Sequence, residues 1–138
     1  MAFAGVNYPG IVAAAVASFV FGAVWYGALG KVWMRAIGKT GPQMAAKDMP
    51  KGPMVITFVA QLVMAWVLAG TVAHFGPGQV TVKNAVVTAV LLWIGFVITT
   101  IAANHAFQGQ KRVLTAIDGG HWLGVLAIQG LVIGALGV

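Results

Sequence analysis

The side chains that most often bind metal ions or haem are few in this chain, and they are mainly three histidines. His74, His105 and His121 fall near the ends of apolar stretches, and the chain has no cysteine. Imidazole binds many metals and can hold haem iron. His105 and His121 could share one metal, but no carboxylate accompanies them within a helix. We therefore expect no metal and no cofactor. Haem or pigment binding through one of these histidines is the less favoured alternative.

Acidic residues are too scarce for most hydrolytic or proton-transfer mechanisms. The two carboxylates are Asp48 and Asp118, and we expect Asp118 to cap the N-terminus of the last helix, where its charge is favourable. The chain has no paired carboxylates, no nucleophile elbow, no phosphate loop and no zinc-protease motif. The sequence therefore predicts a protein that is not an enzyme, and it offers no buried carboxylate for proton-coupled transport.

Polar side chains within the apolar stretches are the remaining candidates for a binding site. Such groups are costly in hydrocarbon and face a partner or a cavity. Two readings remain open: structural hydrogen bonds between helices, which we favour, or a small polar pocket with the two inner histidines at its mouth. The candidates are Gln61, Thr99, Thr100, Asn104, His105, His121 and Gln129.

Composition identifies the kind of elements that must position these side chains. Of 138 residues, 60% are hydrophobic and 7% are charged, with a formal net charge of +6. Soluble domains carry about 25% charged residues. Because so few charges cannot supply a soluble surface, we expect a membrane protein, and the positive charge then indicates orientation and lipid contact rather than nucleic-acid binding.

Four apolar segments approach the roughly 20 residues that a membrane helix needs. They cover residues 9–30, 53–75, 82–104 and 120–138. Prolines stand at the start of the first two, and a Gly76-Pro77-Gly78 turn separates the second from the third. The sequence therefore predicts one all-α membrane domain, residues 1–138, built as an up-down bundle of four transmembrane helices.

Basic residues are concentrated in the first and third predicted loops, and only Lys83 lies in the second. Because cytoplasmic loops carry the lysine and arginine excess, we expect these two loops in the cytoplasm and both termini outside. The side chains expected at the inner surface, in contact with anionic lipid, are Lys31, Trp33, Arg35, Lys111 and Arg112.

Small residues recur at four-residue spacing in the first and last segments. Small side chains let membrane helices approach closely. The spacing predicts tight helix contacts, within one chain or between two. The residues are Gly10, Ala14, Ser18 and Gly22, and then Gly120, Gly124, Gly130 and Gly134.

The N-terminal third carries a recognisable pattern: Asn7-Tyr8, then Trp25-Tyr26, then Gly30, Lys31 and Trp33. With its length and four-span layout, the chain resembles the bacterial membrane family known as domain of unknown function 1761. The resemblance implies a multi-pass protein of the bacterial inner membrane and brings no known activity.

Together these features predict a small non-enzymatic membrane protein that acts through helix–helix association. It would form a homo-oligomer or serve as an accessory subunit of a larger membrane complex. The alternative is a small-molecule carrier or channel whose pathway is lined by the glutamines of the second and fourth helices and the polar residues of the third, and an enzyme acting on lipid is the third choice.

Overall fold

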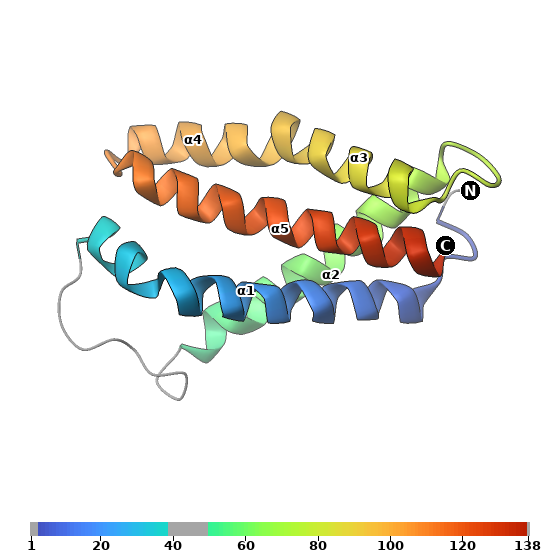
Figure 1. The fold of residues 1–138 in the computed structure, drawn as a ribbon, viewed down its shortest axis with the longest axis horizontal. Coiled ribbons are helices and arrows are strands. Elements are labelled where there is room, and N and C mark those ends of the chain that lie inside the picture. Colours follow the sequence, from blue (N-terminus) through green and yellow to red (C-terminus); the bar gives the residue numbers. More distant parts are fainter. Residues whose placement is uncertain (1–2, 39–49, 138) are drawn as a thin grey trace.

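The computed structural model describes residues 3–38 and 50–137, and the regular elements in those residues are all helical (Figure 1). In chain order they are α1 (Tyr8–Ala36), α2 (Lys51–Ala73), α3 (Val82–Leu92), the π-helical turn η2 (Trp93–Val97), α4 (Ile98–Phe107) and α5 (Arg112–Leu136). Because α3, η2 and α4 follow one another without a break, they form a single long helix.

Within the described ranges, four helices are long and apolar enough to cross a membrane, and this confirms the predicted all-helical class. They span Tyr8–Ala36, Lys51–Ala73, Val82–Phe107 and Arg112–Leu136. The first begins at Tyr8, just after Asn7, whose side-chain Oδ1 accepts a hydrogen bond from Gly10 N at 3.0 Å. A cap of this kind satisfies one of the backbone N–H groups that a helix leaves unpaired at its start.

The last helix begins at Arg112, eight residues before the predicted start of the fourth span. Its N-cap is Lys111, so the expectation that Asp118 caps this helix is wrong. The physical reason is an amphipathic start: Leu114 and Ile117 are buried, and Asp118, one turn after Leu114, is half-buried within the helix. The charged positions lower the local hydropathy, although they do not interrupt the helix.

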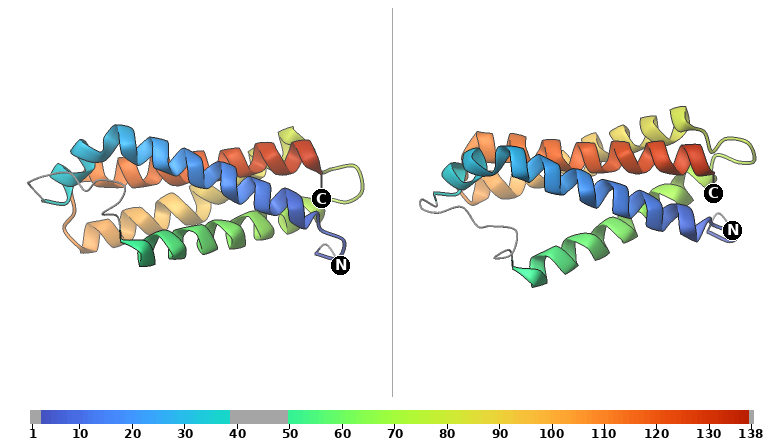
Figure 2. Two further views of the ribbon diagram at one scale, coloured as in Figure 1. Left: turned by 90° about the horizontal axis from the view of Figure 1, so that it is seen from below. Right: turned by 60° about the horizontal axis from the view of Figure 1, so that its bottom comes forward.

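Helix α5 lies between α1 and the long helix α3–η2–α4, and α2 packs behind them (Figures 1 and 2). The core where they meet is built largely of small residues, with a few branched aliphatic side chains between them. Its fully buried members include Ala14, Ala65, Leu68, Val72, Ala85 and Ala89. Close approach of backbones in this core supplies the dispersion contacts that hold membrane helices together.

Glycines of α5 make the closest of these approaches. A Cβ at Gly134 would overlap the backbone of Val82, and one at Gly130 would lie 2.9 Å from the Ala85 carbonyl oxygen. At the other half of α5, Gly120 and Gly124 lie against the rings of Trp25 and Phe21 of α1. The α5 glycines therefore contact two different neighbours within the same chain.

Residues of the α1 pattern also face the interior. Gly10, Ala14, Ser18 and Gly22 are all buried. A Cβ at Gly22 would lie 2.8 Å from the His121 ring nitrogen Nε2, so α1 and α5 pack closely at this level.

The two ends of the bundle differ in charge. The C-terminal end of α1, the start of α2 and the turn before α5 lie at one end, together with Lys31, Arg35, Lys51, Lys111 and Arg112 (Figure 1). The α2–α3 turn lies at the other end, together with Lys83 in the first turn of α3, and there Asn7 Nδ2 is 3.5 Å from the Gly137 carbonyl oxygen. Lys39, Lys47 and Asp48 of the first predicted loop lie outside the described residues.

Candidate functional site

The two glutamines of the predicted polar pocket meet in the core, together with a serine of α1. Ser18, Gln61 and Gln129 are all completely buried. Ser18 Oγ lies 2.7 Å from Gln61 Oε1, and Gln129 Nε2 donates to Ser18 Oγ at 3.1 Å and to the Gln61 carbonyl oxygen at 3.0 Å. These contacts join α1, α2 and α5 at one level of the bundle.

Most of the polar side-chain atoms in this cluster have a hydrogen-bond partner, but two do not. Ser18 Oγ also lies 3.0 Å from the Ala15 carbonyl oxygen, so its one proton has two acceptors. Within the described residues, Gln61 Nε2 and Gln129 Oε1 are buried without a hydrogen-bond partner. The side chains fill the core among Ala14, Ala65 and other small residues and act as the interhelical polar contacts described for membrane bundles.

The other polar residues of the predicted pocket lie elsewhere, and the seven candidates do not form one pocket. Thr99 and Thr100 are exposed on α4, and each donates its hydroxyl proton to the carbonyl four residues earlier, at 2.9 and 2.6 Å. Asn104 is exposed near the end of the same helix. The π-helical turn η2 is the physical reason, because it adds a residue to one turn and rotates α4 relative to α3.

His121 is buried among aromatic rings and does not lie at a pocket mouth. Its ring lies 4.8 Å from that of Tyr26 and 4.7 Å from that of Trp122, centroid to centroid, and it stacks on Phe21 at 6.3 Å. Its Nδ1 has no hydrogen-bond partner within the described residues. We interpret His121 as a packing residue between α1 and α5.

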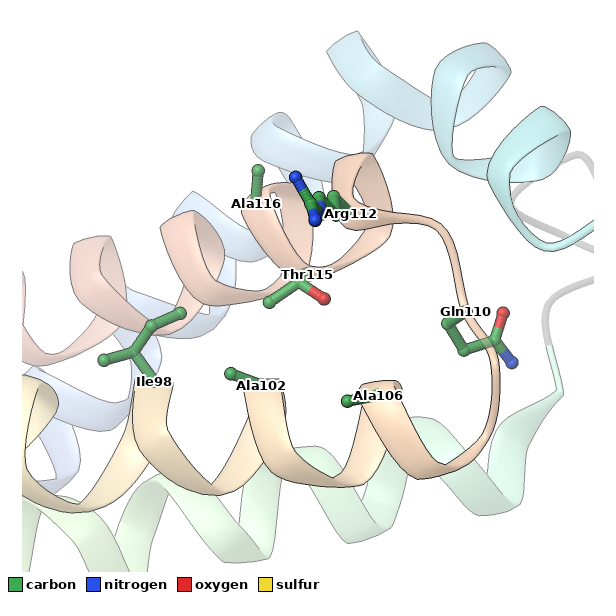
Figure 3. Close-up of a pocket in the computed structure, with 7 residues that line it drawn as sticks. All are labelled: Ile98, Ala102, Ala106, Gln110, Arg112, Thr115 and Ala116. Carbon is green, nitrogen blue, oxygen red and sulfur yellow. The ribbon is translucent and has the colours of Figure 1, made fainter.

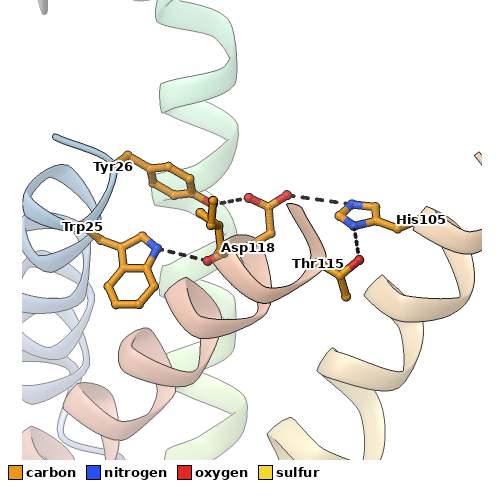
Figure 4. A network of polar contacts seen from close by, with 6 residues as sticks. Trp25, Tyr26, His105, Thr115 and Asp118 are labelled. Carbon is orange, nitrogen blue, oxygen red and sulfur yellow. Dashed lines mark hydrogen bonds and ion pairs between the residues drawn. The ribbon is translucent and has the colours of Figure 1, made fainter. Parts of the chain in front are cut away.

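A second polar network, which sequence reasoning missed, joins three helices near the basic end of the bundle (Figure 4). Tyr26 of α1 donates its hydroxyl proton to Asp118 Oδ1 of α5 at 2.6 Å. Asp118 Oδ2 lies 3.8 Å from His105 Nε2 of α4, and His105 Nδ1 lies 3.0 Å from Thr115 Oγ1. Side chains of Asp118 and His105 are only 22% and 16% exposed. The network therefore ties α1 and α4 to α5.

The spacing of residues in the sequence could have indicated part of this network. Thr115 and Asp118 are three residues apart, so both lie on one face of a helix once that helix is known to begin at Arg112. The residue before Tyr26 adds to the same contact, because Trp25 Nε1 donates to the Ile117 carbonyl oxygen at 3.0 Å. The Trp25-Tyr26 pair thus docks α1 onto α5 with two side-chain hydrogen bonds.

The structure also contains a groove that is open on one side, between α4 and α5, with a volume of about 480 Å³ (Figure 3). Small apolar side chains make most of its walls, and polar ones stand near the turn between the helices. Its lining residues are Ile98, Ala102, Ala106, Gln110, Arg112, Thr115 and Ala116. Thr115 belongs both to this groove and to the network around Asp118.

None of the three histidines is placed with other metal-binding groups in a complete ligand set. His74 lies at the end of α2, with Nδ1 2.7 Å from the Gly70 carbonyl oxygen, while the ring nitrogens of His105 face Thr115 and Asp118. In residues 3–38 and 50–137, no three His, Cys, Asp or Glu side chains come together in a way that could hold a metal ion.

Comparison with known proteins identifies one family. The family model described as "Protein of unknown function (DUF1761)" matches residues 9–134, which is most of the chain, and confirms the resemblance carried by the N-terminal pattern. No curated protein and no solved structure matches the chain significantly. Any proposal about activity must therefore come from the geometry of this chain.

Proposed function

Because the chain belongs to the DUF1761 family, whose function is unknown, we propose from its own geometry that it is a non-enzymatic membrane subunit that acts through helix–helix association. The association surface is the outer face of η2 and α4. In this proposal the protein lies in the bacterial inner membrane and forms a homo-oligomer or joins a larger membrane complex.

The observation that carries this proposal is the poor burial of the third span. Neither η2 nor α4 has a buried residue. In the most apolar window of Val82–Phe107 only 17% of the residues are buried inside the chain, against 39% for Arg112–Leu136. Of the four spans, this one has the smallest buried fraction and so leaves most of its residues free to contact lipid or another protein.

Beside the exposed Ile94 and Phe96, this face carries a group of small and hydroxyl residues that favour protein over lipid as the partner. Thr99, Thr100 and Ala103 are exposed on α4, and Gly95 is exposed on η2 with open space around it. Small and hydroxyl side chains are those that membrane helices place at their interfaces, because they permit close backbone approach. The threonine hydroxyls already bond to their own helix, so they can enter such an interface without leaving an unpaired polar group.

Cysteine cross-linking in membranes tests the proposal, and the chain is suited to it because it has no cysteine of its own. We expect Thr100→Cys, on the proposed surface, to form a disulfide-linked dimer under mild oxidation, because residues near the axis of a two-fold interface meet their own copies. A disulfide requires Cα atoms roughly 4.4–6.8 Å apart. A product of twice the chain mass supports the homo-oligomer, and a discrete larger product supports the accessory subunit.

The matched control is Val24→Cys on α1, where the native side chain is 66% exposed but lies away from α4. We expect little cross-linking at this position. If both variants stayed monomeric, or both cross-linked equally, association through α4 would be excluded.

Orientation and lack of catalysis are part of the same proposal. Apart from Lys83, the basic residues described by the structure lie at one end of the bundle, which supports a cytoplasmic location of that end. Asp118 is the single acid in the described ranges, and its contacts with Tyr26 and His105 link helices rather than face a cavity. A polar transport pathway receives less support, because Gln61 and Gln129 are enclosed in the core.

A further inference from the structure

The groove between α4 and α5 is apolar along most of its length because the residues facing it are short. Ile98 stands at its inner end, where it packs against Gly119, at which an added Cβ would lie 2.5 Å from Ile98 Cδ1. Beyond this contact, Ala102 and Ala106 of α4 line one side of the groove, and Thr115 of α5 points toward them (Figure 3). Methyl groups do not bridge the space between the two helices, and the groove of about 480 Å³ remains.

In a bilayer such a groove must be filled, because atoms that line an empty space lose their dispersion contacts. Hydrocarbon is the material available at this depth. From Ile98 to Ala106 the helix rises about 12 Å, at roughly 1.5 Å per residue. The groove thus has the length and the lining expected for part of an extended acyl chain.

Its outer end is polar and positively charged. Gln110 and Arg112 line the groove where it meets the turn, and Lys111 lies between them in the sequence. No acidic residue occupies the first turn of α5, and within the described residues no carboxylate pairs with Arg112. Arginine, with its planar set of donors, is well suited to bind a phosphate group.

From this combination we propose that the groove is a binding site for one anionic phospholipid. One acyl chain lies along Ala102 and Ala106, and the headgroup phosphate is bound by Arg112 with support from Gln110 and Lys111. The inference goes beyond the association proposed for α4, since the groove lies on the side of that helix that faces α5. Lipid binding and cross-linking at Thr100 are separate measurements, so one can fail without the other.

Native mass spectrometry of the purified protein tests the site with two lipids of identical acyl chains, phosphatidylglycerol and phosphatidylcholine. We expect one phosphatidylglycerol to be retained at least about five-fold more tightly than phosphatidylcholine, which corresponds to about 1 kcal/mol for a cation beside an anionic headgroup. Arg112→Gln should remove this preference. Lys51→Gln, which changes an exposed basic residue at the same end but outside the groove, should leave it unchanged.

A second pair of variants tests the apolar part. Ala106→Leu places a larger side chain in the groove and should weaken retention of phosphatidylglycerol at least about ten-fold, since each methylene excluded from an apolar site costs about 0.8 kcal/mol. Ala28→Leu adds the same side chain to an exposed position on α1 that does not line the groove, and should have no effect.

Equal retention of the two lipids by the unaltered protein would overturn the proposal. Equal effects of Ala106→Leu and Ala28→Leu would also overturn it, because lipid would then bind without entering the groove. Should Ala106→Leu fail to fold, the comparison of Arg112→Gln with Lys51→Gln still tests the proposal. If a partner chain rather than lipid filled the groove, the protein would lose its bound phosphatidylglycerol when it forms oligomers. This outcome too would contradict the proposal.

Discussion

Trp25 and Trp93 come from different helices and bind carbonyl groups two residues apart on α5. The indole Nε1 of Trp25 donates to the Ile117 carbonyl oxygen at 3.0 Å, and that of Trp93 donates to the Gly119 carbonyl oxygen at 2.8 Å. A helical carbonyl has a second lone pair that can accept such a bond. The two tryptophans therefore hold α1 and the start of η2 on either side of α5.

Replacement of either tryptophan by phenylalanine should lower the free energy of unfolding by about 1–2 kcal/mol, from the lost hydrogen bond and the smaller ring. Reversible unfolding in detergent micelles, followed by circular dichroism, gives this quantity for Trp25→Phe and Trp93→Phe. Trp66→Phe is the control, because Trp66 is 39% exposed and packs on Phe3, so only ring area is lost. Equal losses at all three positions would show that the indole bonds to α5 contribute nothing.

Close packing of α5 on α3 gives the second prediction. Gly134→Ala would push a methyl group into the Val82 backbone, which cannot move aside as a side chain can. We expect a loss of about 1–3 kcal/mol in the free energy of unfolding. Gly27→Ala is the matched change, because nothing lies within 4 Å of an added Cβ there, and the better helix propensity of alanine should leave it neutral or slightly stabilising. If the two variants had the same stability, α3 and α5 would not pack this closely in the membrane.

Hydropathy and residue size were sufficient to predict the helical class and the elements that pack in the core. The runs of apolar residues are long, and small residues at four-residue spacing in α1 occupy one buried face. The proximity of two polar side chains could also be read from the sequence: Gln61 and Gln129 were both predicted as members of one polar cluster and do meet, through Gln129 Nε2 and the Gln61 carbonyl oxygen. Both inferences follow from helical geometry alone.

The parts that could not be predicted depend on changes of helical phase and on contacts between distant helices. No local sequence pattern predicts the π-helical turn at Trp93–Val97. A prediction that assumes a regular α-helix therefore gives the wrong orientation for the face of α4 that carries Thr99 and Thr100. Likewise, the partner of Asp118 is Tyr26, which is 92 residues away in the sequence. A hydropathy scan also ends a span at its first charges, and therefore missed the first turns of α5.

The bond between Tyr26 and Asp118 gives the third prediction. Tyr26→Phe removes the donor from a carboxylate that is largely enclosed between helices, and a hydrogen bond to a charged group is worth about 1.5–3 kcal/mol. We expect a loss of that size in the free energy of unfolding, measured in micelles at neutral pH. Tyr8→Phe, at a side chain that is 60% exposed at the start of α1, should cause no measurable loss.

A second substitution separates the role of the hydrogen bond from that of the charge. Asp118→Asn keeps an oxygen that can accept the proton of Tyr26 and removes the ionic contact with His105, so it should cost less than Tyr26→Phe. Greater damage from Asp118→Asn than from Tyr26→Phe would mean that the carboxylate stabilises the bundle mainly through His105, and the hydrogen bond from Tyr26 would then not be the principal contact of the network.

The buried cluster of Ser18, Gln61 and Gln129 gives the last prediction, which also bears on function. Gln129→Met keeps the length of the side chain and removes its polar atoms, including the unpaired Oε1. Ser18 can still donate to the Ala15 carbonyl oxygen, so we expect the free energy of unfolding to fall by only about 0.6–1.7 kcal/mol, the range of polar contacts between membrane helices.

Gln129→Glu instead places an acid where an amide donates to two oxygens, 3.0 and 3.1 Å away. It should cost at least about 2.5 kcal/mol, because a charge in the membrane interior is poorly tolerated. Unfolding in micelles at neutral pH measures both. If Gln129→Glu were as stable as Gln129→Met, water would reach this level of the bundle, and a polar pathway through Gln61 and Gln129 would regain support over a closed structural core.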